Sequence, residues 1–374
     1  MKKIIIGLCV VVLIAVFGGR AWWLYQHKET GDDIVKIGAV LPMSGIVSDS
    51  NKKIVATLNV AKDIIEAENL LENQCISYQL EDGKYTVKDS LSAFNKLITD
   101  KPNAIIVLGD VPVYGLKTRI KENKIPTIAL ITGTADITKN NPYLFRAFHA
   151  NNVLAEKNSK FLLDKGADTV AILRIKNNYG DDMANTFIEK FEQGGGKVLI
   201  NESYAMDSLD VRPQIAKILN TNPKAVFITG SGTGYIAAFN QLKENAYEGI
   251  VLTESAIMDT EVYSHITNNA EGCYFATAEY GFEQLPTFKG RYQKAIQEEP
   301  DIFTAFTLMT MQVLTEAIRR GGTEPEGIRR ALLSLKDFDT VMGKVTFNAD
   351  GELYLDSLSI KQMQADGTAK IVKE

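Results

Sequence analysis

Short apolar runs alternate with longer amphipathic stretches along most of the chain after residue 33. The short runs are rich in β-branched residues and apolar at nearly every position, as expected of strands covered on both faces. The predicted strands are Val35–Leu41, Ala104–Leu108, Thr127–Ile131, Thr169–Leu173, Ala225–Thr229, Ile250–Thr253 and Cys273–Ala278. The helices predicted between them are Ile54–Glu66, Val87–Ile98, Leu116–Asn123, Met183–Gly194, Val211–Leu219 and Ile236–Asn245. This alternation indicates an α/β fold with parallel sheets and right-handed crossovers.

Two parts of the chain repeat the same spacing of landmarks. In each part, a glycine after a predicted strand is followed by a helix and then by a threonine at the end of the next strand. The pairs are Gly109 with Thr132 and Gly230 with Thr253, and both are 23 residues apart. The repeat predicts two similar Rossmann-like lobes.

Polar residues follow the predicted strands in both lobes. In open α/β sheets ligands bind beyond the carboxyl ends of the strands, because helix N-termini and free backbone N–H groups converge there. The candidate site residues are Ser44, Asp110, Thr132, Gly133 and Thr134 in the first lobe and Tyr179, Ser231, Thr233, Glu254 and Ser255 in the second. If the lobes face each other, these turns line one cleft, which is a usual place for a small-molecule site.

Two of these turns carry complementary chemistry. Glu254 ends an apolar strand, so its carboxylate is a candidate partner for a ligand ammonium group; a helix cap or a solvated acid is the alternative. The hydroxyls and N–H groups of Thr132–Asp136 make a neutral cradle for a ligand carboxylate, with a cap on a short helix as the alternative. Tyr179, beside Gly180, would place a flat face over the ligand.

The segment Gly230–Gly234 follows a strand and opens a helix, as a dinucleotide-binding turn does. Tyr235 stands where the third glycine is required, which leaves open a nucleotide site, a turn close to a small ligand, or an ordinary connection. Ser44 lacks a G-x-S-x-G setting, and His149 lies in a segment that is interpreted as a strand passing between lobes. We expect no catalytic residue and no enzyme activity.

The composition is that of a globular protein, with 45% hydrophobic and 23% charged residues and a formal net charge of −5. The basic residues are scattered, so we expect no nucleic-acid partner. The three histidines and three cysteines lie far apart, which predicts no metal and no other cofactor. Cys75 and Cys273 could pair in an oxidising compartment, but they fall in different predicted lobes, and two buried thiols are the alternative.

The first thirty residues predict export. Two lysines precede the apolar run Ile4–Phe17, which is the layout of an export signal. No clean cleavage site follows, and the stretch up to Tyr25, with Arg20 and two tryptophans, is nearly long enough to span a bilayer. Residues 1–30 are therefore predicted to be either a signal peptide or an N-terminal membrane anchor. The rest of the chain is expected in the periplasm or at the outer face of the cytoplasmic membrane.

Four segments, taken in order, carry a resemblance to a known family. They are Val35–Gly45, the stretch from Ile125–Ala129 to Leu144–Arg146, Asn178–Gly180, and Gly343–Gly351. The chain resembles the type I periplasmic binding proteins, specifically the branched-chain amino-acid-binding group that serves ABC uptake systems. The resemblance implies two lobes with parallel central sheets, joined by three hinge crossings, that close on a ligand. The lobes would comprise residues 33–149 with 279–337 and residues 150–278 with 338–374.

The resemblance also implies roles for individual residues. The ligand carboxylate would meet the turn that holds Thr134, and the ammonium would meet Glu254 with help from Tyr179. The chain departs from the family pattern at several positions. Val113 and Tyr114 stand in place of a serine pair, and Ser50 and Gly232 stand at places that are often aromatic. These departures speak against leucine or isoleucine as the ligand.

The sequence thus predicts a monomeric, non-enzymatic solute-binding protein. It would capture an amino acid or a similar small polar metabolite between the lobes and pass it to an ABC permease. The alternatives are a membrane-tethered sensor domain of the same fold and an exported α/β enzyme. The predicted ligand-binding residues are Ser44, Asp110, Tyr114, Thr132, Gly133, Thr134, Tyr179, Ser231 and Glu254.

Overall fold

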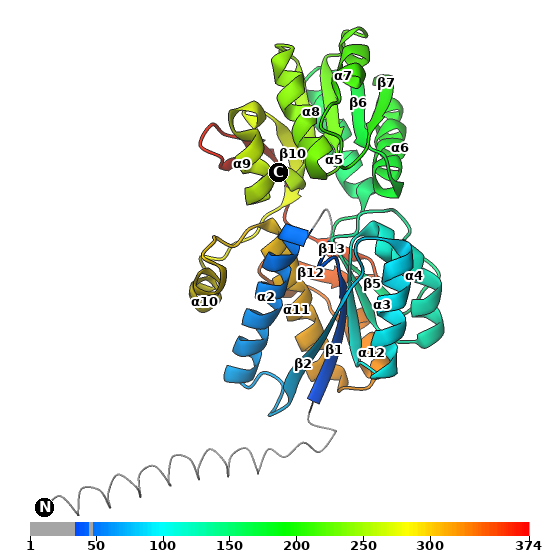
Figure 1. Ribbon diagram of the computed structural model, residues 1–374, viewed down its shortest axis with the longest axis vertical. Helices are drawn as coiled ribbons and strands as arrows, with labels where there is room; N and C mark the ends of the chain where they lie inside the picture. The colour runs from blue at the N-terminus through cyan, green and yellow to red at the C-terminus, as the bar shows by residue number, and fades with distance from the viewer. Residues whose placement is uncertain (1–33, 45–47, 374) are drawn as a thin grey trace, which may run out of the picture.

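The computed structural model describes residues 34–44 and 48–373, and it has two lobes stacked along its long axis (Figure 1). The lower lobe contains the first strands of the chain, and the upper lobe carries the C-terminal end. The predicted signal peptide or anchor, residues 1–30, lies outside the described residues. Within the described ranges, no helix combines the length and the apolar character needed to cross a membrane.

The first lobe is built on a parallel five-stranded sheet with the order β2-β1-β3-β4-β5. Its strands are β1 (Ile34–Leu41), β2 (Cys75–Asp82), β3 (Ala104–Leu108), β4 (Thr127–Leu130) and β5 (Leu144–Ala147). Its helices are α2 (Ser48–Ala67), α3 (Val87–Thr99), α4 (Asp110–Asn123), α10 (Pro286–Ile296), α11 (Ile302–Gly321) and α12 (Pro325–Ser334). Successive residues of β3 enter opposite apolar clusters, one shared with α2, α11 and α12 and the other with α3 and α4. Burial on both faces explains the uninterrupted apolar runs.

The second lobe repeats this arrangement, with β7-β6-β8-β9-β10 as its parallel core. These strands are β6 (Thr169–Ile175), β7 (Lys197–Tyr204), β8 (Ala225–Thr229), β9 (Ile250–Glu254) and β10 (Tyr274–Ala278). The helices are α5 (Asn151–Asp164), α6 (Asn178–Gln193), α7 (Arg212–Leu219), α8 (Gly232–Glu244) and α9 (Thr260–Ile266), with 3-10 turns η1 (Ser255–Met258) and η2 (Thr267–Ala270). The strand order matches that of the first lobe, which confirms the two similar lobes predicted from the glycine–threonine spacing.

The C-terminal segment contributes to both lobes. Strands β11 (Phe338–Thr340), β12 (Gly343–Phe347) and β13 (Leu353–Leu355) form a small antiparallel sheet, and β14 (Leu358–Met363) and β15 (Ala369–Lys373) extend the second sheet beyond β10. Val345 and Phe347 are buried in the core of the first lobe. The lobe boundary expected at residue 338 is therefore wrong, because these apolar side chains hold the segment against the first lobe as far as Leu355.

The chain passes between the lobes three times, at residues 148–150, 279–285 and 356–357. The second and third crossings are hydrogen-bonded to each other, since Glu279 N donates to Ser357 O at 3.1 Å. Gly281 N, further along the second crossing, donates to Val341 O at 3.1 Å. Short crossings that run side by side can act as a hinge, because few residues need to absorb a rotation of the lobes.

The edge strands β2 and β7 were not predicted from the sequence. Each lies at an edge of its sheet, and most of its residues are only partly buried. A strand with one partner and a half-exposed surface needs no continuous apolar run. Hydrophobic periodicity therefore detects the central strands and misses these two.

The two cysteines of the described chain are separate thiols. Cys273 is buried, and burial raises its pKa to about 12. Cys75 is exposed at the start of β2. The disulfide considered from the sequence is wrong, and so is the expectation that both thiols are buried.

Candidate functional site

A cavity of about 160 Å³ lies between the lobes at the carboxyl ends of both parallel sheets. Four of the predicted ligand-binding residues line it: Asp110, Tyr179, Ser231 and Glu254. Most of the remaining wall is apolar and includes the rings of Tyr85, Phe148, Phe303 and Phe306. Pockets for drug-sized ligands have volumes of roughly 300 Å³ or more, so this cavity suits a smaller solute.

Glu254 is the acidic group that the second lobe presents to the cavity. It ends β9, is almost fully buried, and accepts three hydrogen bonds from its own lobe. Tyr179 Oη donates to Oε1 at 2.6 Å, while Thr229 Oγ1 and Gly230 N donate to Oε2 at 2.7 and 2.9 Å. Burial raises the pKa of Glu254 to about 7 although these donors lower it, and the nearby Asp110 carboxylate raises it further.

Asp110 is the matching acidic group of the first lobe, at the start of α4. Thr134 donates to Asp110 Oδ1 twice, from its backbone N at 2.7 Å and from its hydroxyl at 2.5 Å. Gly133 N makes a longer contact of 3.4 Å with Oδ2. Burial raises the pKa of Asp110, while the Thr134 donors and the Arg146 charge oppose that rise.

The turn at Thr134 does hold a carboxylate, as its chemistry predicts, but the carboxylate belongs to Asp110. In this structure the two donors of Thr134 are therefore bonded to Asp110 and are not available to a ligand carboxylate. Thr132, the first residue of the turn, is buried, and its hydroxyl lies 3.3 Å from Leu130 O.

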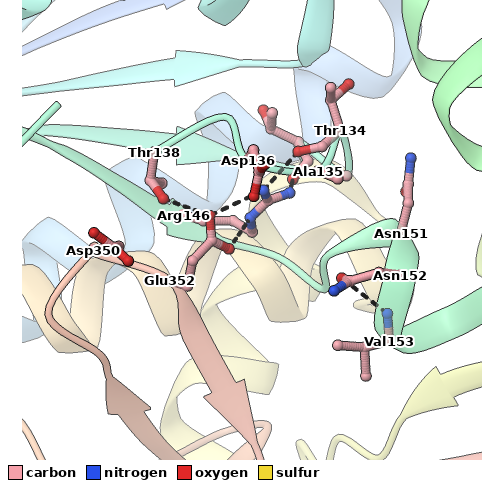
Figure 2. A network of polar contacts seen from close by, with 12 residues as sticks. Thr134, Ala135, Asp136, Thr138, Arg146, Asn151, Asn152, Val153, Asp350 and Glu352 are labelled. Carbon is pink, nitrogen blue, oxygen red and sulfur yellow. Dashed lines mark hydrogen bonds and ion pairs between the residues drawn. The ribbon is translucent and has the colours of Figure 1, made fainter. Parts of the chain in front are cut away.

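Arg146 contacts the same turn and also Glu352 (Figure 2). This β5 side chain is fully buried, and it donates to Thr132 O at 2.7 Å, to Thr134 O at 2.6 Å and to Glu352 Oε2 at 2.6 Å. Ile131, just before the turn, has φ 49°, a conformation that β-branched residues rarely adopt. The turn is thus clamped, with its carbonyls bonded to Arg146 and its N–H groups bonded to Asp110.

The lobes touch each other around the cavity. Gly133 faces Asn151 and the Tyr179 ring, so that a Cβ added there would lie 2.8 Å from Tyr179 Cε2 and would overlap the Asn151 amide. Asp182 Oδ2 on α6 accepts from Ala135 N at 2.9 Å and from Asn151 Nδ2 at 2.8 Å. These contacts join the turn of the first lobe directly to the second lobe.

A buried ion pair also crosses between the lobes. Lys53 on α2 lies 2.6 Å from Asp301 in its own lobe and 3.5 Å from Asp259 in the other lobe. The ammonium group therefore has carboxylates from both lobes within reach, and opening the lobes would separate it from Asp259.

Several predicted residues lie away from the cavity. Ser44 is exposed, and its hydroxyl donates to Asp82 Oδ2 at 2.5 Å. Tyr114 is 59% exposed on α4. Thr233 Oγ1 donates to Met206 O at 3.3 Å, whereas Ser255 lines the cavity as expected. The side chain of Ser50 lies outside the described residues.

The glycine-rich segment brings Gly230 and Ser231 to the cavity wall. The Gly230 N–H group already donates to Glu254, so it does not serve as a phosphate donor here. The turn therefore reaches the cavity wall, and its closeness to a small ligand stays a prediction. Val113, one of the departures from the family pattern, is fully buried in the core.

His149 lies at the first crossing, where it is buried against Phe148 and Phe306. Burial lowers the pKa of its imidazole to about 3, so the ring is neutral at physiological pH. Its burial among aromatic rings indicates a structural role at this crossing.

Sequence reasoning missed the aromatic part of the cavity. Tyr85 precedes α3, and its ring packs so closely against Gly109 that a Cβ added there would overlap Tyr85 Cε2. Phe303 and Phe306 project from the first turn of α11 at a spacing typical of one helix face. That spacing is the only sequence signal, and it does not distinguish a cavity-facing ring from a core ring.

Comparisons with known proteins agree with this architecture. A family model described as periplasmic binding protein matches residues 34–368. The Leu/Ile/Val-binding protein BraC3 of Rhizobium johnstonii is 22% identical over 338 residues, covering 88% of this chain and 92% of that protein. The structure of a leucine-binding protein, LivK, from Thermotoga maritima MSB8 has a TM-score of 0.81 at 21% identity, covering 90% of this chain and 97% of that one.

Another similar structure is an ABC transporter solute-binding protein from R. palustris in complex with benzoate. Its TM-score is 0.82 at 18% identity, with 91% of this chain and 96% of that chain covered. The two-lobed α/β architecture with an interlobe cavity is thus that of a type I periplasmic binding protein. The chain belongs to the periplasmic binding protein family, and its resemblance to the branched-chain amino-acid-binding group is confirmed.

The clamp on the Thr134 turn makes a prediction for stability. Arg146→Met removes the cation that pairs with Glu352 and the donor to the Thr132 and Thr134 carbonyls, so the free energy of unfolding should fall by about 3–5 kcal/mol in urea titrations. Arg119→Met is the matched control, because its ion pair with Glu122 is exposed and should contribute about 0.5 kcal/mol or less. Equal losses in both variants would contradict the clamp.

The raised pKa of Glu254 makes a second prediction, for the ligand-free protein. From about pH 4.5 to pH 7 the folded state binds more protons at Glu254 than the unfolded chain, so stability falls as pH rises through this window. Glu254 lowers the free energy of unfolding by about 3 kcal/mol across this window. The difference between urea titrations at pH 5 and pH 8 should therefore be smaller in Glu254→Gln by this amount.

Glu192→Gln, at an exposed position of α6, serves as the control for that pH comparison and should keep the wild-type slope. A Glu254→Gln variant with the same pH slope as the wild type would show that Glu254 does not titrate in this window.

Proposed function

We propose that this chain is an extracytoplasmic solute-binding protein that captures a small polar metabolite with an ammonium group and delivers it to an ABC permease. The observation that carries the proposal is the cavity at the carboxyl ends of both sheets, walled by residues of both lobes. The family match supports binding rather than chemistry as the activity. We infer that the protein works in the periplasm or at the outer face of the cytoplasmic membrane, as a monomer.

Binding would be coupled to closure of the lobes. Groups from both lobes line the cavity, so a ligand makes its full set of contacts only when the lobes are together. A ligand shifts a conformational equilibrium through its preference for one state, and here that state is the closed one. The three short crossings, of which the second and third are hydrogen-bonded to each other, supply the hinge.

Glu254 and Tyr179 form the proposed ammonium site. The carboxylate is buried, so its attraction for a cation is stronger than at the protein surface. The Tyr179 hydroxyl donates to Oε1 and fixes the orientation of the carboxylate, while its ring forms part of the wall.

Closure is tested by small-angle X-ray scattering. A thermal-shift screen of amino acids, amines and small carboxylates, followed by calorimetry, supplies the ligand, which should reduce the radius of gyration of the wild type. Gly133→Ala should abolish this contraction, because the added methyl group meets Asn151 and Tyr179 of the other lobe. Gly290→Ala, where nothing lies within 4 Å, is the control and should contract normally. Identical free and bound profiles of the wild type would refute closure.

The ammonium site is tested by calorimetry across pH. With any ammonium ligand from the screen, Glu254→Gln should weaken binding at pH 8 by about 1.4 kcal/mol or more, which is tenfold. Wild-type affinity should fall as pH drops below about 7, because Glu254 then becomes protonated and loses its charge. The variant should show no such fall, and unchanged affinity in the variant would refute the role of Glu254.

A further inference from the structure

The cavity wall carries one carboxylate from each lobe. Asp110 and Glu254 both line it, and each is 4% exposed. Among the described residues that line the cavity, none is lysine, arginine or histidine. The Asp110 charge raises the pKa of Glu254, so the two groups are close enough to interact. A ligand in this cavity therefore meets negative charge from two directions.

At the Thr134 turn, the donors that would receive a ligand carboxylate are already in use. Both the backbone N–H group and the hydroxyl of Thr134 donate hydrogen bonds to Asp110 Oδ1. Arg146 is the cation that contacts this turn most closely among the described residues. Its guanidinium group donates to the Thr132 and Thr134 carbonyls and to Glu352. A ligand carboxylate placed here would meet the carboxylate of Asp110 instead of hydrogen-bond donors.

Both acidic groups retain capacity to accept hydrogen bonds from a ligand. An ionised carboxylate offers about four acceptor sites. Among the described residues, Asp110 Oδ2 has only the 3.4 Å contact with Gly133 N, and Glu254 Oε1 has a single donor, Tyr179. The remaining acceptor sites suit a group that only donates, as an ammonium does.

The aromatic wall favours the same kind of ligand. Phe148, Phe303 and Phe306 line the cavity together with Tyr85 and Tyr179. Ring faces attract organic cations, and they also cover the apolar body that such a cation carries. Two buried carboxylates repel each other, and a cation between them relieves that repulsion.

We propose that the cavity takes an organic amine that has no free carboxylate beside its ammonium group, and that Asp110 excludes α-amino acids from it. This inference rests on the proposed function and names the substrate class of the same site. Asp110 then acts as a specificity-determining residue, because it fills the place that a ligand carboxylate would need. The ammonium lies between Asp110 and Glu254, with the apolar body against the rings.

The experiment compares amines with the amino acids from which they differ by one carboxylate. The pairs are 3-methylbutylamine with leucine and 2-phenylethylamine with phenylalanine, measured by calorimetry at pH 8. We expect each amine to bind at least tenfold tighter than its amino acid. Equal or tighter binding of the amino acids overturns the inference, and so does a failure of the amines to bind.

Variants of Asp110 test its role directly. Asp110→Asn keeps an oxygen for the Thr134 donors but removes the charge, so amine affinity should fall at least tenfold while the fold persists. Asp110→Ser should free the Thr134 donors and raise affinity for the amino acids. Asp207→Asn, an exposed aspartate, is the control for loss of one charge and should bind as the wild type does. Unchanged amine affinity in Asp110→Asn would leave Asp110 with only a structural role and overturn the inference.

The inference and the proposed function fail in different ways. If amino acids or carboxylates bind and contract the wild type in scattering, the proposed function stands and the amine specificity is wrong. If no compound of the wider screen binds or closes the lobes, both are wrong.

Discussion

The site depends on the bond between the Asp110 carboxylate and the Thr134 turn. A buried carboxylate is costly unless donors surround it, and a strained turn persists only when its contacts hold it. Here the backbone N–H group and the hydroxyl of Thr134 donate to the Asp110 carboxylate, which holds the turn in place. Arg146 donates to the carbonyls of the same turn. The arrangement makes the first lobe's edge of the cavity acidic, although the local sequence of hydroxyls and glycine favours an anion site.

Each lobe places one buried carboxylate at the cavity, but the acidic residue follows a different strand in each lobe. In the first lobe the acid follows the third strand in chain order and accepts from the turn after the fourth. In the second lobe Glu254 ends β9 and accepts from Thr229 and Gly230 at the end of β8. Both acids cross between neighbouring strands at the same edge of their sheets, where backbone N–H groups are free. Duplicated strand order thus places two carboxylates at one cavity although their sequence contexts differ.

The residues that join the two lobes also adjoin the proposed ammonium site. Gly133 is small enough for the Tyr179 ring to approach, and Tyr179 in turn orients Glu254. In the same turn, the backbone N–H group of Ala135 donates to Asp182 of the second lobe.

The sequence by itself determined the α/β class and the central strands, because strands that are buried on both faces need continuous apolar runs. It also determined the repeat of the two lobes, because the glycine–threonine spacing is the same in both. It also predicted Glu254, Tyr179 and Asp110, which line the cavity, since ligands meet the residues that follow parallel strands. Only the tertiary structure decided that Asp110 occupies the Thr134 donors and that rings from α11 and the first crossing complete the wall. Such pairings join residues from separate elements, and spacing along the chain carries no record of which donor meets which acceptor.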